Sequence, residues 1–350
     1  MRRLIFFSIV TAVVFFGQRT AAQQSLTDSL FARYLEALRA QAGIPGMSAL
    51  VLQGGTITWE RHFGFQDVEN AIPPRWDTPY AIGGMSQIFG STLLLKKCVD
   101  EGLRHPADPV TDWIPAFPEP GATLLHLLAH VHPNGAYRYD AARFSLLTAV
   151  VEACASMPYE RLLAEEVFSR LGLTHSVPGT ELAAPAARDL LTFGPNNLER
   201  YAAILARIAT PYRVDTRGRP ARSELPQFRV DASAGVVTTV FDLARFDATL
   251  DHADEVLLRR ATQVGAWTRP APHLPMGLGW FVQGYNGNAV VWQFGLVPNA
   301  YSSLIVKVPN RRLTFILLAN SDGLSSPFAL ENGDVTASLF ARLFLRLYVP

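Results

Sequence analysis

The stretch from Tyr80 to Lys97 constrains the fold most, because it combines a buried helical pattern with an unusual start. Its apolar residues recur at intervals of three and four, at Ile82, Met85, Phe89, Leu93 and Leu94. This spacing predicts a helix with one face in the core. Gly83-Gly84 favours no particular structure, so we expect the helix to begin there because its apolar face packs, and not because a side chain caps it.

The composition indicates a sizeable globular protein without a nucleic-acid-binding surface. The chain has 350 residues, 49% of them hydrophobic, which is enough for one large core or two closely joined subdomains. Without the three arginines among residues 1–22, it carries 28 basic and 30 acidic side chains, a formal charge of −2. That balance gives no reason to expect nucleic acid as a partner.

The first 22 residues have the order of a secretory signal peptide. Arg2-Arg3 precedes an apolar run from Leu4 to Gly17, and Thr20-Ala21-Ala22 provides small residues for cleavage after Ala22. A membrane anchor is the alternative, but about 14 apolar residues are short of the roughly 20 that span a bilayer. We therefore expect an exported protein, periplasmic or extracellular, with no membrane span after signal removal.

Cys98 and Cys154 are the only cysteines of the chain. An oxidising compartment would allow them to pair. Each lies in an apolar helical pattern, however, so buried free thiols are the preferred interpretation, and a disulfide is the alternative.

Hydrophobic patterns predict the other elements of the chain. The predicted helices cover residues 28–41, 144–153, 159–171, 239–250 and 335–348, and the predicted strands cover 47–53, 56–62, 301–308 and 313–319. Residues 178–229 are poorly patterned and contain prolines and arginines, so we expect loops there.

Several short segments along the chain share their order with one enzyme family. They are Gly43–Ser48, Gly64–Asp67, Asp108–Pro115, Leu124–His130 and Ala234–Thr239. Together with the helix at 80–97, they resemble the serine β-lactamase and DD-peptidase (penicillin-binding protein-like) family. The resemblance is especially to its class C and esterase-like branch. The resemblance covers about residues 25–346 and implies an α/β (α+β) fold, with an antiparallel sheet flanked by helices and an all-α subdomain. The sheet subdomain would comprise about 23–78 and 236–350, and the helical subdomain about 79–235.

The first catalytic motif of that family, Ser-x-x-Lys, is missing. It supplies the nucleophile and its base at the start of the helix, and the matching positions here are Gly84 and Gln87. The chain has three lysines, Lys96, Lys97 and Lys307, and none follows a serine by three places. Lys96 would also lie roughly 18 Å along the helix from Gly84, too far to act as its base.

Ser86 is the remaining hydroxyl near the helix start, and it is the fallback nucleophile of an active enzyme. Gly84-Met85-Ser86 forms half of a Gly-x-Ser-x-Gly elbow, but Ile88 replaces the second glycine. Two helical positions also turn Ser86 about 200° from the face of Gly84.

The other two motifs of the family are altered as well. Tyr-x-Asn or Ser-x-Asn matches Tyr139-Asp140-Ala141, which keeps the phenol and loses the amide. Tyr139 is either an aromatic residue packed at the floor of the cleft or a ligand contact. Lys-Thr-Gly or His-x-Gly matches the stretch from Trp292 to Gly295, in which Gln293 replaces the titratable residue and Gly295 is kept.

Three histidines invite a metal site. His126 and His130 are one helical turn apart, and His132 lies close by. No carboxylate lies within this cluster, and the family has a His-Leu-Leu-x-His run here without a metal. We therefore expect neither a metal nor a cofactor.

Arg143 is a candidate ligand-binding residue. It follows Tyr139 by four positions, so both could point toward the cleft and bind a carboxylate. Trp292 or Phe294 would then supply an apolar wall. Solvation of Arg143, or its pairing with Asp140, is the alternative.

Three motifs altered together favour a catalytically inactive pseudoenzyme, because loss of a nucleophile costs on the order of 10⁶ in rate. We expect a β-lactamase-related, serine-hydrolase-like protein with a ligand-binding or regulatory role linked to cell-wall peptides or acyl compounds. The ligand would be a small molecule or a peptide, and the sequence identifies no protein partner. The alternative is an active serine hydrolase, a β-lactamase, D-amino-acid peptidase or esterase, with a rearranged site.

Overall fold

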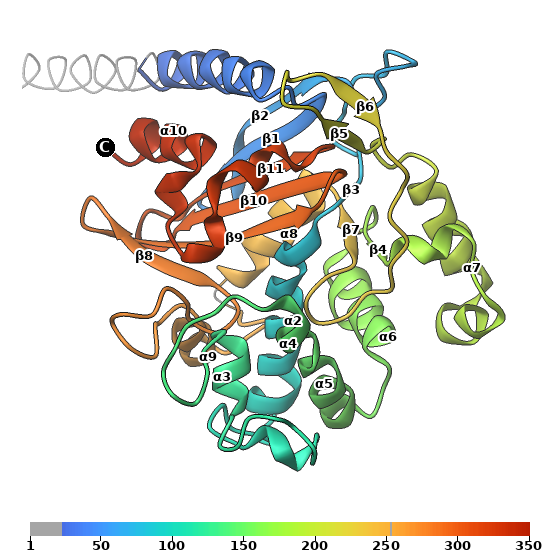
Figure 1. Cartoon of the computed structure of the whole chain (residues 1–350), viewed down its shortest axis with the longest axis vertical. Coiled ribbons are helices and arrows are strands. Elements are labelled where there is room, and N and C mark those ends of the chain that lie inside the picture. Colours follow the sequence, from blue (N-terminus) through green and yellow to red (C-terminus); the bar gives the residue numbers. More distant parts are fainter. Residues whose placement is uncertain (1–22, 253) are drawn as a thin grey trace, which may run out of the picture.

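The computed structural model describes residues 23–252 and 254–350. The predicted signal peptide therefore lies outside the described residues. A six-stranded antiparallel sheet in the order β2-β1-β11-β10-β9-β8 forms the centre of the molecule (Figure 1). Its strands are β1 (Gly46–Gln53), β2 (Thr56–Gly64), β8 (Phe281–Tyr285), β9 (Asn288–Val297), β10 (Tyr301–Val308) and β11 (Leu313–Ala319). The four strands predicted at 47–53, 56–62, 301–308 and 313–319 are confirmed as β1, β2, β10 and β11.

The sheet has two apolar faces because successive side chains of a strand point to opposite sides. On β11, Phe315 and Leu317 belong to one hydrophobic cluster, whereas Ile316 and Leu318 belong to the other. The first face is covered by the helix over residues 23–41 and by α10 (Leu339–Tyr348), which lie together at the top of Figure 1. The two ends of the described chain thus close the same face.

The opposite face is covered by α8 (Val240–Leu250) and by the predicted central helix. That helix consists of a 3-10 turn over Gly83–Ser86, then α2 (Gln87–Leu94), then a wider π-helical turn over Leu95–Asp100. All eight residues of α2 are buried, and no side chain caps the 3-10 turn. As predicted, packing and not capping accounts for where this helix begins.

Further short elements surround α2. The helices are α3 (Leu124–Leu128), α4 (Ala141–Ser145), α5 (Leu147–Ala155), α6 (Tyr159–Leu163), α7 (Ala187–Leu205) and α9 (Arg260–Ala266). The short strands are β3 (Tyr80–Ala81), β4 (Val177–Pro178) and β7 (Val236–Thr238), which form one small sheet, and the pair β5 (Tyr212–Val214) and β6 (Pro220–Arg222). Figure 1 shows α3, α4 and α5 gathered around the lower part of α2.

The expectation of loops throughout 178–229 is wrong at α7, which spans 19 residues. Gly194, with φ of 72°, and Pro195 kink this helix, so no single helical period runs through it. Its second half nevertheless buries Leu198, Tyr201 and Leu205. A pattern broken in the middle conceals a helix from a search for periodicity.

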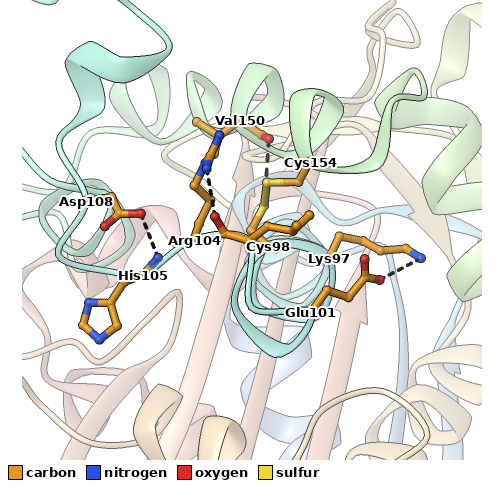
Figure 2. The surroundings of a disulfide bond; sticks show 9 residues. Lys97, Cys98, Glu101, Arg104, His105, Asp108, Val150 and Cys154 are labelled. Atoms are coloured by element: carbon orange, nitrogen blue, oxygen red, sulfur yellow. Dashed lines mark hydrogen bonds and ion pairs between the residues drawn. A yellow bond between two sulfur atoms is a disulfide. The ribbon is translucent and has the colours of Figure 1, made fainter.

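Cys98 and Cys154 form a disulfide, with their Cα atoms 5.5 Å apart (Figure 2). The preferred interpretation as free thiols is therefore wrong. An apolar helical setting does not prevent pairing, because the π-helical turn after α2 and α5 lie side by side and present the two thiols to each other. Closing a loop between positions 56 residues apart stabilises the fold by about 4 kcal/mol in the chain-entropy model.

Candidate ligand-binding cleft

A cavity of about 420 Å³ opens where the start of α2, the end of β9 and the segment before α4 meet. Gly84, Tyr139 and Ala141 line this cavity, and so does Phe294, which lies beside Gln293 in the third motif. Segments that are far apart in the sequence thus bring all three degenerate motifs to one place. This volume lies within the range of roughly 300–1,000 Å³ that is usual for small-molecule sites.

Gly84 is the residue that the sequence matches to the nucleophile of the first motif. A Cβ atom built on Gly84 would lie 2.7 Å from the Tyr139 hydroxyl oxygen and 3.5 Å from the Phe294 carbonyl oxygen. A side chain at position 84 would therefore stand between the second and third motifs. Because 2.7 Å is closer than a Cβ atom tolerates, Tyr139 fills part of the space that a serine would take.

Gln87 is the centre of a buried hydrogen-bond network. Its side-chain nitrogen donates to the Tyr139 hydroxyl at 3.0 Å, and its oxygen accepts from His130 Nε2 at 3.0 Å. The Gln293 side-chain nitrogen lies 3.4 Å from the same Gln87 oxygen and donates to the Gly279 carbonyl at 3.0 Å. We call Gln87, His130, Tyr139 and Gln293 the amide network.

The protonation of His130 follows from its partners. Its Nδ1 accepts from the backbone N–H of Asp140 at 2.9 Å, so Nε2 carries the proton that is donated to Gln87. Burial, and then the charge of Arg143, lowers the pKa of His130 to about 3. The imidazole is therefore neutral at pH 7.

Tyr139 is neutral for the same reason. Burial raises the pKa of its phenol above the ordinary value, and the hydrogen bond from Gln87 only partly offsets that effect. Its ring stacks on His130 with centroids 4.5 Å apart. The amide network therefore has no charged member near neutral pH.

Gly295 has a structural role in the third motif. A Cβ atom at Gly295 would lie 1.7 Å from the Ile82 carbonyl oxygen, so only glycine lets β9 approach the chain before α2 so closely. The Ser303 hydroxyl donates to the same carbonyl at 2.8 Å. This close approach holds the start of α2 against the sheet.

Ser86 does not reach the cavity. Its side chain is fully buried, and its oxygen accepts from the backbone N–H of Val236 at 3.2 Å. The fallback nucleophile is therefore excluded by its position: it ties α2 to β7 and faces away from Gly84.

The expected carboxylate site at Arg143 is also wrong. The guanidinium is 7% exposed, donates to Glu119 through two nitrogens at 3.0 and 2.9 Å, and donates to the His126 carbonyl at 3.0 Å. Asp140 is not its ionic partner, since that carboxylate caps α4 by accepting from the backbone N–H of Arg143 at 3.0 Å. The spacing from Tyr139 was correct for one helical face, but α4 begins only after Tyr139, so the two side chains diverge.

The apolar wall includes only one of the two expected aromatic residues. Trp292 is fully buried, stacks on Phe281 with centroids 4.2 Å apart, and does not line the cavity. Phe294 does line the cavity, and its ring lies 5.4 Å from that of Tyr139.

The three histidines serve separate purposes. His126 accepts from the backbone N–H of Thr123 at 3.0 Å and so closes the capping box of α3. His132 contacts Glu119 at 3.1 Å, whereas His130 belongs to the amide network. Residues 23–252 and 254–350 contain no group of three or more His, Cys, Asp or Glu side chains that could hold a metal ion.

Two polar residues of the cavity wall had no signal in the sequence. Ser233 donates its hydroxyl to Asp231 Oδ1 at 2.8 Å, and the same oxygen accepts from the backbone N–H groups of Ser233 and Ala234. Asp231 thus holds a tight turn and is a poor base for Ser233. Glu331 lies in one of the short 3-10 turns between β11 and α10 (Leu330–Asn332), and only the folded chain brings it to the cavity.

The sheet, its helices and the cleft at the start of α2 define a protein of the β-lactamase/transpeptidase-like fold. The chain belongs to the beta-lactamase family, whose model matches residues 31–337. It is 20% identical to a putative D-alanyl-D-alanine carboxypeptidase of Escherichia coli (strain K12), and the match covers 87% of this chain and 86% of the relative.

Two solved structures support the fold itself. A penicillin-binding protein homologue from Pyrococcus abyssi has a TM-score of 0.73 at 19% identity, covering 91% of this chain and 77% of that chain. A class C β-lactamase from Rhodobacter sphaeroides has a TM-score of 0.67 at 18% identity, covering 91% and 98%. The predicted family and fold class are confirmed.

Proposed function

We propose that this chain is a non-catalytic member of the beta-lactamase family that binds a small ligand in the cleft. The observation that carries the proposal is the glycine at position 84, at the point where the three motifs converge. Acyl transfer in this fold needs a nucleophile there and a base within reach. Here the position of the base, three residues after Gly84, holds Gln87, whose side chain is hydrogen-bonded to neutral partners.

The cleft supports a binding role because the cavity persists without the catalytic groups. Its walls are mainly apolar, with Phe228, Phe294 and Leu296 contributing side chains. An apolar cavity with a few polar groups is the usual form of a small-molecule site. We propose a small molecule or the end of a cell-wall peptide or acyl compound as the ligand, in keeping with the D-alanyl-D-alanine named for the E. coli relative.

Export is part of the proposal. The disulfide between Cys98 and Cys154 supports it, because structural disulfides persist in oxidising compartments outside the cytosol. In the described part of the chain, no helix is both long and apolar enough to cross a membrane.

The test is covalent labelling of the purified protein with a fluorescent penicillin and a fluorophosphonate, read by intact mass. We expect no adduct, because Gly84 offers no atom to acylate. An adduct that maps to the peptide containing Gly84 and Ser86, or to the one containing Ser233, would overturn the proposal in favour of an active hydrolase.

A gain-of-function variant provides the positive control. Gly84→Ser combined with Gln87→Lys should restore a detectable adduct, whereas either substitution alone should not, because a nucleophile and its base act as a unit. The hydroxyl of Tyr139 must move for the serine to fit, given the 2.7 Å approach. Circular dichroism of each variant would confirm that it is folded.

A further inference from the structure

The charge distribution of the cleft indicates which ligands it takes. We propose that the cleft binds apolar amines, with the apolar body inside the cavity and the ammonium group at Glu331. The inference rests on the proposed function and names the ligand class of the same cleft. The ligand would then carry a positive charge, whereas a carboxylate site at Arg143 would have required a negative one.

Apolar groups make up most of the cavity surface. Leu296, Val297 and Pro298 follow one another at the end of β9, and Phe228 adds a further apolar side chain. Phe294 and Tyr139 add two aromatic rings inclined by 35°. Such walls favour a hydrocarbon or phenyl group, because removing apolar surface from water is favourable.

Glu331 is the single ionisable carboxyl group on these walls, and no Lys, Arg or His side chain lines the cavity among the described residues. The backbone oxygen of Glu331 accepts from the Tyr137 hydroxyl at 2.7 Å, which fixes the turn that carries it. Its carboxylate has no hydrogen bond or ion pair to any residue in 23–252 or 254–350, and the side chain is exposed. A negative charge without a protein partner thus stands at the entrance of an apolar cavity.

Two cations beside the cleft are committed elsewhere, and the exposed Arg138, between Tyr137 and Tyr139 in the chain, does not line the cavity. Arg143 is paired with Glu119, and Arg229 lies 2.5 Å from Glu160 and 3.2 Å from Glu181. The other polar side chains on the wall, those of Tyr139 and Ser233, are uncharged. On the cavity wall itself, a carboxylate ligand would therefore be repelled by Glu331, whereas an ammonium group would be attracted.

The experiment uses three probes with the same body and different heads: 4-phenylbutylamine, 4-phenylbutanol and 4-phenylbutyrate. Isothermal titration should rank their affinities as amine, alcohol, carboxylate, with about fivefold between neighbours, since one exposed charge pair contributes modestly. Raising the salt concentration should shrink these gaps, because a pair at the entrance is screened.

Glu331→Gln should bring the three affinities within about twofold of one another, through the loss of the charge interaction alone. Glu199→Gln is the matched control, because Glu199 is exposed on α7 and does not line the cavity. Ala141→Phe, which fills the cavity from α4, should weaken all three probes and thereby locate the binding site. Thermal unfolding would verify that each variant is folded.

The inference is overturned if the amine does not bind at millimolar concentration, if the carboxylate binds as tightly as the amine, or if Glu331→Gln retains the full preference. None of these results changes the expectation of no acyl adduct. Failure of the ligand class and failure of the non-catalytic proposal are therefore distinguishable.

Discussion

Two buried polar clusters on the same face of the sheet differ in charge. Lys307 on β10 is 1% exposed and donates to Asp247, which is 2% exposed, and to Asp251 at 3.1 Å. Its ammonium also lies 5.4 Å from the centre of the Trp267 ring. The amide network at the cleft, by contrast, is held by neutral hydrogen bonds alone.

The pKa shifts of the two clusters have opposite consequences. Burial alone lowers the pKa of Lys307, but the charges of Asp247 and Asp251 outweigh it and raise the pKa overall, so the lysine stays charged. In the cleft, burial and then the charge of Arg143 lower the pKa of His130 to about 3, and the opposing effect of Asp140 does not offset them. The chain thus keeps a buried charge where it fastens α8 to the sheet, and has none in the amide network at the cleft.

The largest expected loss of stability comes from breaking the charged cluster around Lys307. Lys307→Met should lower the free energy of unfolding by about 3–5 kcal/mol, because Asp247 is left buried without its counter-charge. Urea denaturation measures the loss. Adding Asp247→Leu should recover much of it, and a cost below about 1 kcal/mol for the single variant would contradict a charged pair.

The next effect concerns the neutral cluster. Gln87→Leu should cost about 1–3 kcal/mol, because His130 and Tyr139 lose a buried partner while no charge is stranded. Thr92→Val is the matched control on α2, since the Thr92 hydroxyl only donates to the Ile88 carbonyl of the same helix. Equal costs for the two variants would show that the amide network adds nothing beyond an ordinary helical hydrogen bond.

The pH dependence of stability tests the protonation of His130. Its pKa is lower in the folded state than the ordinary value of 6.5, so the unfolded chain binds the proton first. The stability that neutral His130 contributes to the fold is therefore complete above pH 6.5 and is lost as the pH falls toward 3. In that range the slope of the unfolding free energy against pH approaches about 1.4 kcal/mol per pH unit. His130→Gln should flatten the unfolding free energy between pH 6.5 and 5.

A control is needed in that pH window because His126 behaves similarly. Burial, and then Arg143, lowers its pKa too. His126→Asn should leave most of the slope in place, because this histidine is less enclosed. If His126→Asn removes the slope and His130→Gln does not, the assignment is wrong.

The smallest expected change in stability concerns the contact between Tyr139 and Gly84. Tyr139→Phe should cost about 0.5–1.5 kcal/mol through one lost hydrogen bond. Gly84→Ala should be better tolerated in that background than alone, because the hydroxyl that meets the new Cβ is gone and the ring carbon that carried it lies 4.0 Å from that position. A double-mutant cycle with coupling of about 1 kcal/mol is expected, and strict additivity would contradict the contact.

The sequence predicted those parts of the fold that follow from repeated spacing or from a family motif. The buried face of α2, the strands β1 and β2, and the positions of Gly84 and Gln87 were of this kind. The amide network was only partly foreseen, because His130 joins Gln87 through a left-handed backbone conformation, with φ of 53°, that no periodicity indicates.

Other features depend on how distant segments meet. Glu331 has no neighbour in sequence that suggests a ligand site. Arg143 pairs with Glu119, which is 24 positions away in the chain. Helix α7 was hidden by its internal kink, and the disulfide depends on two helices lying together. The domain boundaries near 78 and 235 stay a prediction.

The disulfide also changes what a break in the backbone would do. Cys98 and Cys154 enclose the segment that contains α3, α4, Tyr139 and Arg143. A single proteolytic cut between them would leave two pieces still linked through sulfur. The nicked protein would migrate as one chain without reductant and as two pieces with it. Electrophoresis under both conditions would therefore show whether a sample with an altered cleft has a cut backbone or an intact one.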